Sequence, residues 1–142
     1  MSNLSAFLSQ NAIKVENTKF VASKRFVDEK KKPIEWEIQC ISSQKDEEIR
    51  KTSTKRVQIP GKKNQYQPET DFNKYLGLLA VECTVFPNLN DVELQNSYGV
   101  MGADSLLKTM LLPGEYAEYL QKVQEVNGFE VSFEDKVQEA KN

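Results

Sequence analysis

The fold is decided by the stretch Asp71-Phe-Asn-Lys-Tyr-Leu-Gly-Leu-Leu-Ala-Val-Glu-Cys-Thr-Val-Phe86. Its apolar side chains recur at steps of three and four residues, and a second apolar face leaves little of the circumference polar. Thr70 or Asp71 can cap the first backbone N–H groups, and Pro87 disfavours helical geometry at Phe86. The stretch is too short to cross a membrane, which takes roughly 20 apolar residues. It therefore predicts a core helix that reaches Phe86 and is surrounded by protein.

Upstream of this helix, two segments predict an antiparallel hairpin. Residues 19–27 contain paired apolar side chains, and residues 34–40 alternate apolar with polar positions, as in a strand with one wet face. The polar segment 28–33 joins them as a turn. Because an isolated hairpin is only marginally stable, we expect it to pack on the core helix, with residues 56–59 as a further strand of the sheet.

Glycine and proline divide the remaining chain into short helices. Gly99 and Gly128 stand where a helix ends in a left-handed residue, and Pro113 suits a first helical turn. The segment 60–68, rich in proline, glycine and amides, predicts an exposed loop. The predicted helices cover residues 46–52, 90–98, 103–111 and 113–126, with a small amphipathic turn at Leu4, Phe7 and Leu8.

Together these elements predict a single α+β domain over residues 1–142. An N-terminal antiparallel hairpin or small sheet packs against a C-terminal bundle of short helices. The β-rich half, 1–65, carries a net charge of +6, and residues 66–142 carry −8, which gives −2 overall. Within the latter we take 66–128 as the helical acidic half and the mostly polar 129–142 as a mobile tail. Such a charge pattern is paired internally, is solvated, or meets an acidic partner.

The composition argues against an enzyme. The chain contains no histidine, which removes the commonest general base and the Ser-His and Cys-His nucleophilic pairs. Cys40 and Cys83 lack metal-ligand spacing, and the glycine-rich phosphate-binding motifs are absent. Glu82 fits a helix boundary or a basic partner, and the pair Glu115 and Glu118 fits a wet helix surface. We predict no catalytic residue, no metal site and no cofactor.

Basic side chains between Lys30 and Lys63 suggest one alternative, a small nucleic-acid-binding protein. They would contact phosphates, and Tyr66 would stack on a base. No helix-turn-helix, RNA-binding or zinc-finger pattern accompanies these charges, and the other half of the chain is acidic. The sequence therefore favours this class less than a protein-binding one.

A scaffold or chaperone that binds another protein fits better. The C-terminal half supplies many large apolar side chains for four short helices, and Met and Tyr make adaptable contacts. Helix ends near the glycine turns leave such side chains hard to bury completely. The alternative is that all of them belong to the core. The candidate partner-binding residues are Tyr98, Val100, Met101, Leu112, Tyr116 and Tyr119.

The C-terminal half also carries a family resemblance. Its segments are Tyr75-Leu-Gly-Leu-Leu-Ala-Val-Glu-Cys-Thr-Val-Phe-Pro87, Asp91-Val-Glu-Leu-Gln-Asn-Ser-Tyr-Gly-Val-Met-Gly102, Leu106-Leu-Lys-Thr-Met-Leu-Leu-Pro-Gly-Glu-Tyr116 and Val126-Asn-Gly-Phe129. Together they resemble the XkdN-like tail assembly chaperones of bacteriophages and of phage-like elements in Gram-positive bacteria. The likeness is close over residues 70–130 and looser over the hairpin. It is not a catalytic signature and transfers no active-site residue.

The resemblance implies a non-enzymatic role in the bacterial host's cytoplasm. Such chaperones are thought to coat the helical tape measure protein, keep it from aggregating, and help tail-tube subunits polymerise around it. Recognition of an amphipathic helix by several modest contacts is compatible with this role. A reducing compartment also suits the two cysteines, and the N-terminus lacks the features of a signal peptide.

The resemblance raises one further partner, a longer form of the same chain made by ribosomal frameshifting. The residues Ala140-Lys141-Asn142 are compatible with an A-rich slippery heptamer near the end of the first reading frame. We therefore hypothesise that this chain is the short form. Codons without a run of adenines would remove the basis for this hypothesis.

Overall fold

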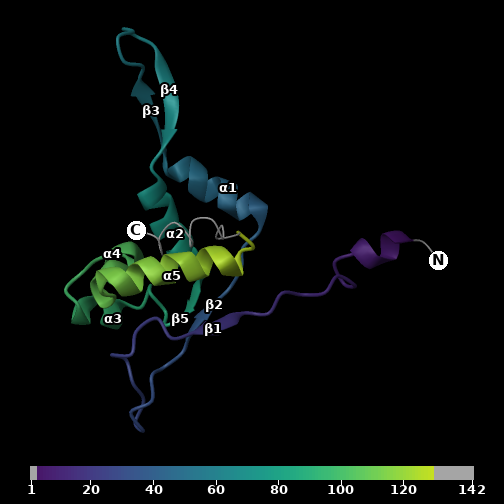
Figure 1. The fold of residues 1–142 in the computed structure, drawn as a ribbon, viewed down its shortest axis with the longest axis vertical. Coiled ribbons are helices and arrows are strands. Elements are labelled where there is room, and N and C mark those ends of the chain that lie inside the picture. Colours follow the sequence, from purple (N-terminus) through teal and green to yellow (C-terminus); the bar gives the residue numbers. More distant parts are fainter. Residues whose placement is uncertain (1–2, 130–142) are drawn as a thin grey trace, which may run out of the picture.

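The structure is a computed structural model that describes residues 3–129. Figure 1 shows a central body with three projections: a hairpin at one end, a loop at the opposite end, and an N-terminal arm that leaves sideways. In chain order the elements are η1 (Asn3–Phe7), β1 (Thr18–Phe20), β2 (Trp36–Ile38), α1 (Ser43–Thr52), β3 (Thr54–Gln58), β4 (Tyr66–Thr70), α2 (Phe72–Cys83), β5 (Thr84–Phe86), α3 (Val92–Ser97), α4 (Ala103–Met110) and α5 (Pro113–Val126).

The predicted N-terminal pairing of strands is confirmed, in a shorter form. β1 pairs antiparallel with β2, and Thr18 lies opposite Ile38. The loop between them has the predicted turn at its tip. There the Asp28 carboxylate accepts hydrogen bonds from the backbone N–H groups of Lys30 and Lys32, at 2.8 and 2.9 Å. Polar residues thus close the loop, while only the strand ends near the body enter the sheet.

The core helix is shorter than predicted, because its last predicted turn is a strand. α2 ends at Cys83, and the extended β5 follows it and pairs antiparallel with β2. The change from helix to strand occurs at Thr84. Its hydroxyl lies 2.7 Å from the Ala80 carbonyl oxygen of α2 and 2.6 Å from the Tyr119 hydroxyl of α5. The helix therefore does not reach Phe86. Residues 84–86, which the sequence predicts as its last turn, form an edge strand of the three-stranded sheet β1-β2-β5.

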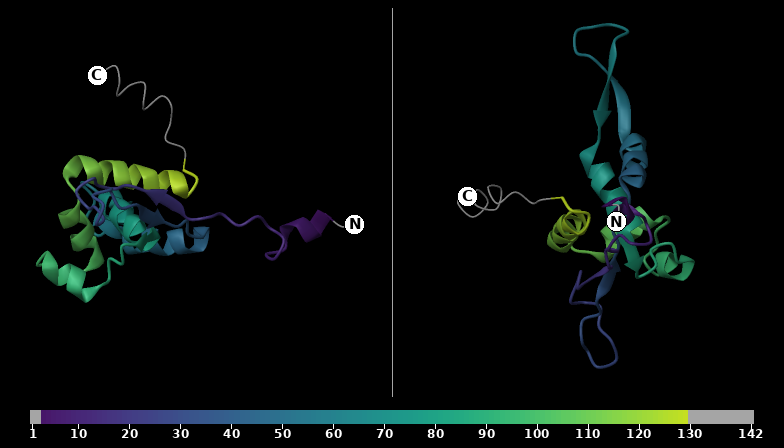
Figure 2. Two further views of the ribbon diagram at one scale, coloured as in Figure 1. Left: turned by 90° about the horizontal axis from the view of Figure 1, so that it is seen from below. Right: turned by 90° about the vertical axis from the view of Figure 1, so that its right-hand side faces the viewer.

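The prediction that residues 56–59 join this sheet is wrong. Residues 56–58 belong to β3, which pairs with β4 in a separate two-stranded hairpin. Only residues 60–65 of the predicted loop 60–68 form a loop, because its last three residues belong to β4. Figures 1 and 2 show this hairpin standing away from the body, so the predicted helical half contains strands as well as helices.

The hydrophobic core lies between the three-stranded sheet and the helices. Trp36 packs edge-on against Tyr119, with ring centroids 5.2 Å apart, and both side chains are buried. α2 contacts α1, α4 and α5, and Figure 2 shows α5 lying across the strands. This arrangement confirms the predicted α+β class, in which antiparallel strands pack on short helices.

α1 is fastened to α2 by a buried tyrosine. Its N-cap is Ser42, whose side chain accepts from Lys45 N–H, so the helix begins at Ser43, three residues before the predicted start at Asp46. The Tyr75 hydroxyl donates to the Asp46 carboxylate, and the Arg50 guanidinium donates to both, at 3.3 Å to the hydroxyl and 3.0 Å to the carboxylate. Burial, together with the neighbouring Asp46, raises the pKa of Tyr75 to about 12.

This pKa predicts a loss of stability in alkaline solution. Tyr75 ionises near pH 10 in the unfolded chain but near 12 in the folded one, so the free energy of unfolding should fall as the pH rises between these values. Urea unfolding at pH 9, 10 and 11, followed by circular dichroism, measures the slope. Tyr75→Phe should flatten it, and an unchanged slope in that variant would contradict the assignment.

The predicted helices of the C-terminal half are confirmed as α3, α4 and α5, within a few residues of the predicted bounds. Asn127 follows α5 and joins it to two other segments. Its Oδ1 accepts from Ile41 N–H at 2.9 Å, and its Nδ2 lies 3.3 Å from Cys83 Sγ and 2.8 Å from the Val123 carbonyl oxygen. The tail predicted at 129–142 lies, beyond Phe129, outside the described residues.

Replacing Asn127 by alanine should cost about 2 kcal/mol of folding free energy. The substitution leaves the half-buried Ile41 N–H without its partner, and such a loss typically costs about 1–3 kcal/mol. Thermal unfolding by circular dichroism measures the change. Gln124→Ala, which removes one side-chain hydrogen bond to Leu120 within the same helix, serves as the matched control and should cost clearly less.

Candidate partner-binding surface

Five of the six candidate residues lie in or next to the two turns that flank α4, and Tyr119 lies farther along α5. The six differ in exposure. Met101 is 91% exposed and Leu112 is 55% exposed. Tyr98, Val100 and Tyr116 are partly buried and pack against the core. The exposed pair thus borders α4 at its two ends, and the partly buried residues lie beneath or beside it.

The α3–α4 turn holds Met101 outward by a framework of hydrogen bonds. Gly99 ends α3 with a φ of +67°, and Val100 N–H returns to the Gln95 carbonyl oxygen at 3.1 Å. The Gln95 side chain then spans the turn, since its Oε1 accepts from Gly102 N–H at 3.0 Å and its Nε2 donates to the Leu89 carbonyl oxygen at 2.9 Å. An exposed methionine on a braced turn is well placed to contact a partner.

The α4–α5 turn presents Leu112 in a similarly fixed way. Leu112 is the N-cap residue of α5, and its N–H donates to Glu115 Oε1 at 2.9 Å. This hydrogen bond, with those from Ser23 and Arg25, lowers the pKa of Glu115. Arg25 also donates to the Met110 carbonyl oxygen, so the β1–β2 loop supports the turn from outside the helices.

Tyr116 is partly buried, and its hydroxyl lies in the interior rather than on this surface. Its hydroxyl and Asp104 Oδ1 are buried without a hydrogen-bond partner, and both face α2 at Gly77. A Cβ at Gly77 would lie 3.0 Å from Asp104 Oδ1 and 3.1 Å from the Tyr116 hydroxyl. The absence of a side chain there lets α4 and α5 approach α2 closely. Burial, together with the neighbouring Asp104, raises the pKa of Tyr116.

Tyr119 belongs to the core. It is fully buried, packs against Trp36 and Phe20, and shares a hydrogen bond with Thr84. Burial raises its pKa well above the ordinary range. In this structure its side chain is not accessible to a partner, so we leave it out of the proposed binding surface.

Sequence reasoning missed several exposed apolar side chains. On α3, Val92 is 69% exposed, because Asp91 caps this short helix with Val92 turned away from the body. Before β1, a whole segment carries such residues. The apolar residues of this segment are visible in the sequence. A local pattern does not show whether the rest of the protein covers them. The exposed residues of this segment are Leu4, Phe7, Leu8, Ile13 and Val15.

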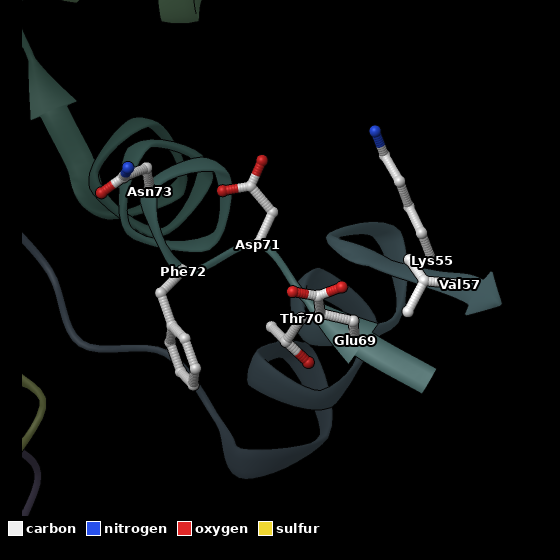
Figure 3. Close-up of a pocket in the computed structure, with 7 residues that line it drawn as sticks. All are labelled: Lys55, Val57, Glu69, Thr70, Asp71, Phe72 and Asn73. Atoms are coloured by element: carbon white, nitrogen blue, oxygen red, sulfur yellow. The ribbon is translucent and has the colours of Figure 1, made fainter. Parts of the chain in front are cut away.

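A wide hollow lies elsewhere, at the base of the β3–β4 hairpin. Figure 3 shows its lining, with the Phe72 ring at one side and Lys55 and Val57 at the other. Its volume is about 450 Å³, and its walls mix charged, amide and apolar groups. Asp71 in this wall is already engaged as the N-cap of α2, accepting from Lys74 N–H at 3.1 Å. The hollow offers no convergent set of polar groups for a small molecule.

The basic residues behind the nucleic-acid alternative do not share one face. Lys30 and Lys32 lie on the β1–β2 loop, whereas Lys62 and Lys63 lie near the tip of the β3–β4 hairpin. Figure 1 places these two projections at opposite ends of the molecule, and the right view of Figure 2 agrees. A single basic groove along these residues is therefore absent from the described structure.

The described residues offer little support for a metal site or a reactive thiol. Among residues 3–129 no group of three or more Cys, Asp or Glu side chains is placed to hold a metal ion. Burial raises the pKa of the Cys83 thiol to about 11, which keeps it protonated and unreactive. In the same part of the chain, no helix combines the length and apolar character needed to cross a membrane.

Comparison with known proteins identifies relatives of this chain. The model of the phage XkdN-like tail assembly chaperone proteins matches residues 4–141. Two proteins of Bacillus subtilis strain 168, protein XkdN of the phage-like element PBSX and the uncharacterized protein YqbN, are each 32% identical over 141 residues. These alignments cover 99% of this chain and 94% and 93% of the two relatives.

A solved structure agrees with the same assignment. The crystal structure of YqbN superimposes with a TM-score of 0.78 at 29% identity, covering 92% of this chain and 99% of that one. Sequence and fold therefore match the same group of proteins over nearly the whole length. The chain belongs to the family of XkdN-like phage tail assembly chaperones.

Proposed function

We propose that this chain binds the tape measure protein during phage tail assembly and keeps it from aggregating. The observation that carries the proposal is the pair of exposed apolar side chains, Met101 and Leu112, on braced turns at the two ends of α4. An assembly chaperone needs apolar surface that its own fold leaves uncovered, and Met101 and Leu112 provide such surface.

The chemistry of the surface suits an amphipathic helical target. α4, which lies between Met101 and Leu112, spans eight residues, or roughly 12 Å at 1.5 Å per residue, which is about the length of two turns of a partner helix. Methionine adapts to different apolar neighbours, which favours binding along a long and varied chain. Several modest contacts of this kind also allow release when tail-tube subunits arrive.

The partners in this proposal are the tape measure protein, the tail-tube protein and a frameshifted longer form of the chain. The role is non-enzymatic and takes place in the cytoplasm of the bacterial host. The absence of histidine and the protonated Cys83 support a binding role rather than a catalytic one. Nucleic acid is not among the proposed partners, because the basic side chains lie on separate projections.

The double variant Met101→Ser with Leu112→Ser should weaken binding to the tape measure protein about tenfold or more. Removing two exposed apolar anchors from a protein interface commonly costs about 1–2 kcal/mol each, and every 1.4 kcal/mol is a factor of ten. Titration of a labelled tape measure fragment, with fluorescence anisotropy as the readout, measures the change.

Co-expression tests the function itself. The full tape measure protein should be found in the soluble fraction with the wild-type chain and in the insoluble fraction with the double variant. Phe72→Ser, an exposed aromatic residue at the hairpin base, is the matched control and should keep the tape measure protein soluble. Equal solubility with and without the wild-type chain would reject the proposal.

A further inference from the structure

The residues before β1 form an arm that leaves the body. Figure 1 and the left view of Figure 2 both show residues 3–17 extending away from the sheet. Phe7 is 79% exposed and Ile13 is 98% exposed, and three more apolar side chains on this arm are also exposed. Apolar surface exposed to this extent on one projecting segment is typical of an interaction site.

The part of the arm around Phe7 has regular hydrogen-bonded structure. A short 3₁₀ helix spans Asn3–Phe7, and both Asn11 N–H and Ala12 N–H donate to the Leu8 carbonyl oxygen at 2.9 Å. At the other end of the arm, the Asn17 side chain donates to the Glu37 carboxylate on β2 at 3.3 Å. The arm therefore starts from a fixed point on the sheet and carries a preformed turn with an exposed phenyl ring.

The body contains a pocket of matching size and character. It has a volume of about 140 Å³, and its lining is almost entirely apolar. An apolar cavity of about 150 Å³ accepts one benzene molecule, so this pocket has room for one phenyl ring. It opens at the surface, where Phe86 is 51% exposed. The pocket is lined by Phe26, Ile34, Trp36, Phe86, Pro87 and Met110.

Arm and pocket lie at opposite ends of the sheet. The arm enters at Thr18, opposite Ile38 of β2. The pocket is at the other end of the same strands, where Trp36 lies opposite Phe20. Figure 1 shows the arm extending away from the sheet at the Thr18 end of β1, whereas the pocket lies at the Phe20 end. Two different, complementary surfaces at opposite ends of a subunit form head-to-tail contacts between copies.

We infer that the N-terminal arm of one copy docks on the next copy of this chain, with Phe7 inserted into the pocket beneath Trp36. Each docked copy keeps one free arm and one free pocket, so the contact builds an open chain of subunits or a closed ring. This inference concerns association between identical chains. It does not depend on which phage protein the chain binds.

Sedimentation velocity of the full chain over a range of concentrations tests this contact. The wild-type chain should form species larger than a monomer, in proportions that rise with concentration. Phe7→Ser should be monomeric at every concentration, and Phe72→Ser, which removes an exposed phenyl ring outside the arm and the pocket, should associate like the wild type. A wild-type chain that stays monomeric throughout, as expected if the arm folds back on its own pocket, would overturn the inference.

Mixing two defective variants tests the head-to-tail geometry. Phe86→Asp, which places a charge on the pocket wall, should be monomeric alone, as should Phe7→Ser. Their mixture retains one working arm and one working pocket, so it should form a 1:1 heterodimer and nothing larger. If Phe86→Asp loses its circular dichroism spectrum, Ile34→Trp, which fills the pocket, replaces it. A mixture that stays monomeric, or a Phe7→Ser chain that still self-associates, would contradict the inference.

Discussion

Replacing Trp36 by alanine should destabilise the fold by about 4 kcal/mol, within the range of about 3–5 kcal/mol seen for such truncations. Trp36 is 1% exposed and sits in the central strand β2. It contacts Tyr119 on α5 and Phe26 in the β1–β2 loop. The substitution therefore opens a cavity where the sheet, the last helix and the loop meet.

A loss of this size is a large share of the roughly 5–15 kcal/mol that stabilises a typical domain. Urea unfolding followed by circular dichroism is the suitable measurement, because Trp36 is the only tryptophan and its fluorescence disappears with it. Phe72→Ala, which truncates a 60% exposed aromatic side chain, is the control and should change stability by less than about 1 kcal/mol. Similar losses for the two variants would contradict the assignment of Trp36 to the centre of the core.

Replacing Gly77 by valine should cost about 3 kcal/mol. Gly77 lies inside α2, where it faces the Asp104 carboxylate of α4 and the Tyr116 hydroxyl of α5. The first added carbon would already lie 3.0 and 3.1 Å from their oxygen atoms, and valine adds two methyl groups beyond it. Overpacking of a core typically costs about 1–3 kcal/mol, and both oxygen atoms are already buried without partners.

Two companion variants separate overpacking from helix propensity. Gly77→Ala gains about 1 kcal/mol of helix propensity, which offsets the tight contact of its single methyl group, so its stability should stay within about 1 kcal/mol of the wild type. Lys74→Val places the same valine at an exposed position of the same helix and should change stability little. If Gly77→Val unfolds at the wild-type urea concentration, the close approach of α4 and α5 to α2 is incorrect.

The parts of the fold that sequence predicted well are those specified by neighbouring residues. α5 begins at Pro113, and α3 ends before Gly99, whose φ of +67° suits glycine. The turn at the tip of the β1–β2 loop also depends on local groups, since Asp28 binds backbone N–H groups two and four residues away. Such features are visible in a short window of sequence.

The parts that sequence predicted wrongly depend on distant partners. Val85 and Phe86 continue the apolar pattern of α2, but the chain leaves the helix at Thr84 because β2 and Tyr119 are nearby in space. β3 finds its partner in β4, where Pro68 and several polar residues resemble a loop. No local pattern reveals these pairings, because both depend on the tertiary arrangement.

The candidate surface divides in the same way. Glycine turns correctly indicated where side chains such as Met101 and Leu112 are exposed. The burial of Tyr119 depends on Trp36, which lies far away in the sequence. The brace formed by Gln95 was missed for a related reason, because its two hydrogen bonds reach residues on opposite sides of α3.

Hydrogen exchange of the chain, free and bound to a tape measure fragment, tests the central claim most directly. The claim is that the turns flanking α4 form the surface that holds the partner. Binding should slow amide exchange over residues 98–112, with little change in the β3–β4 hairpin. Slowed exchange confined to that hairpin, or no difference between the free and bound chain at saturating fragment, would contradict the claim.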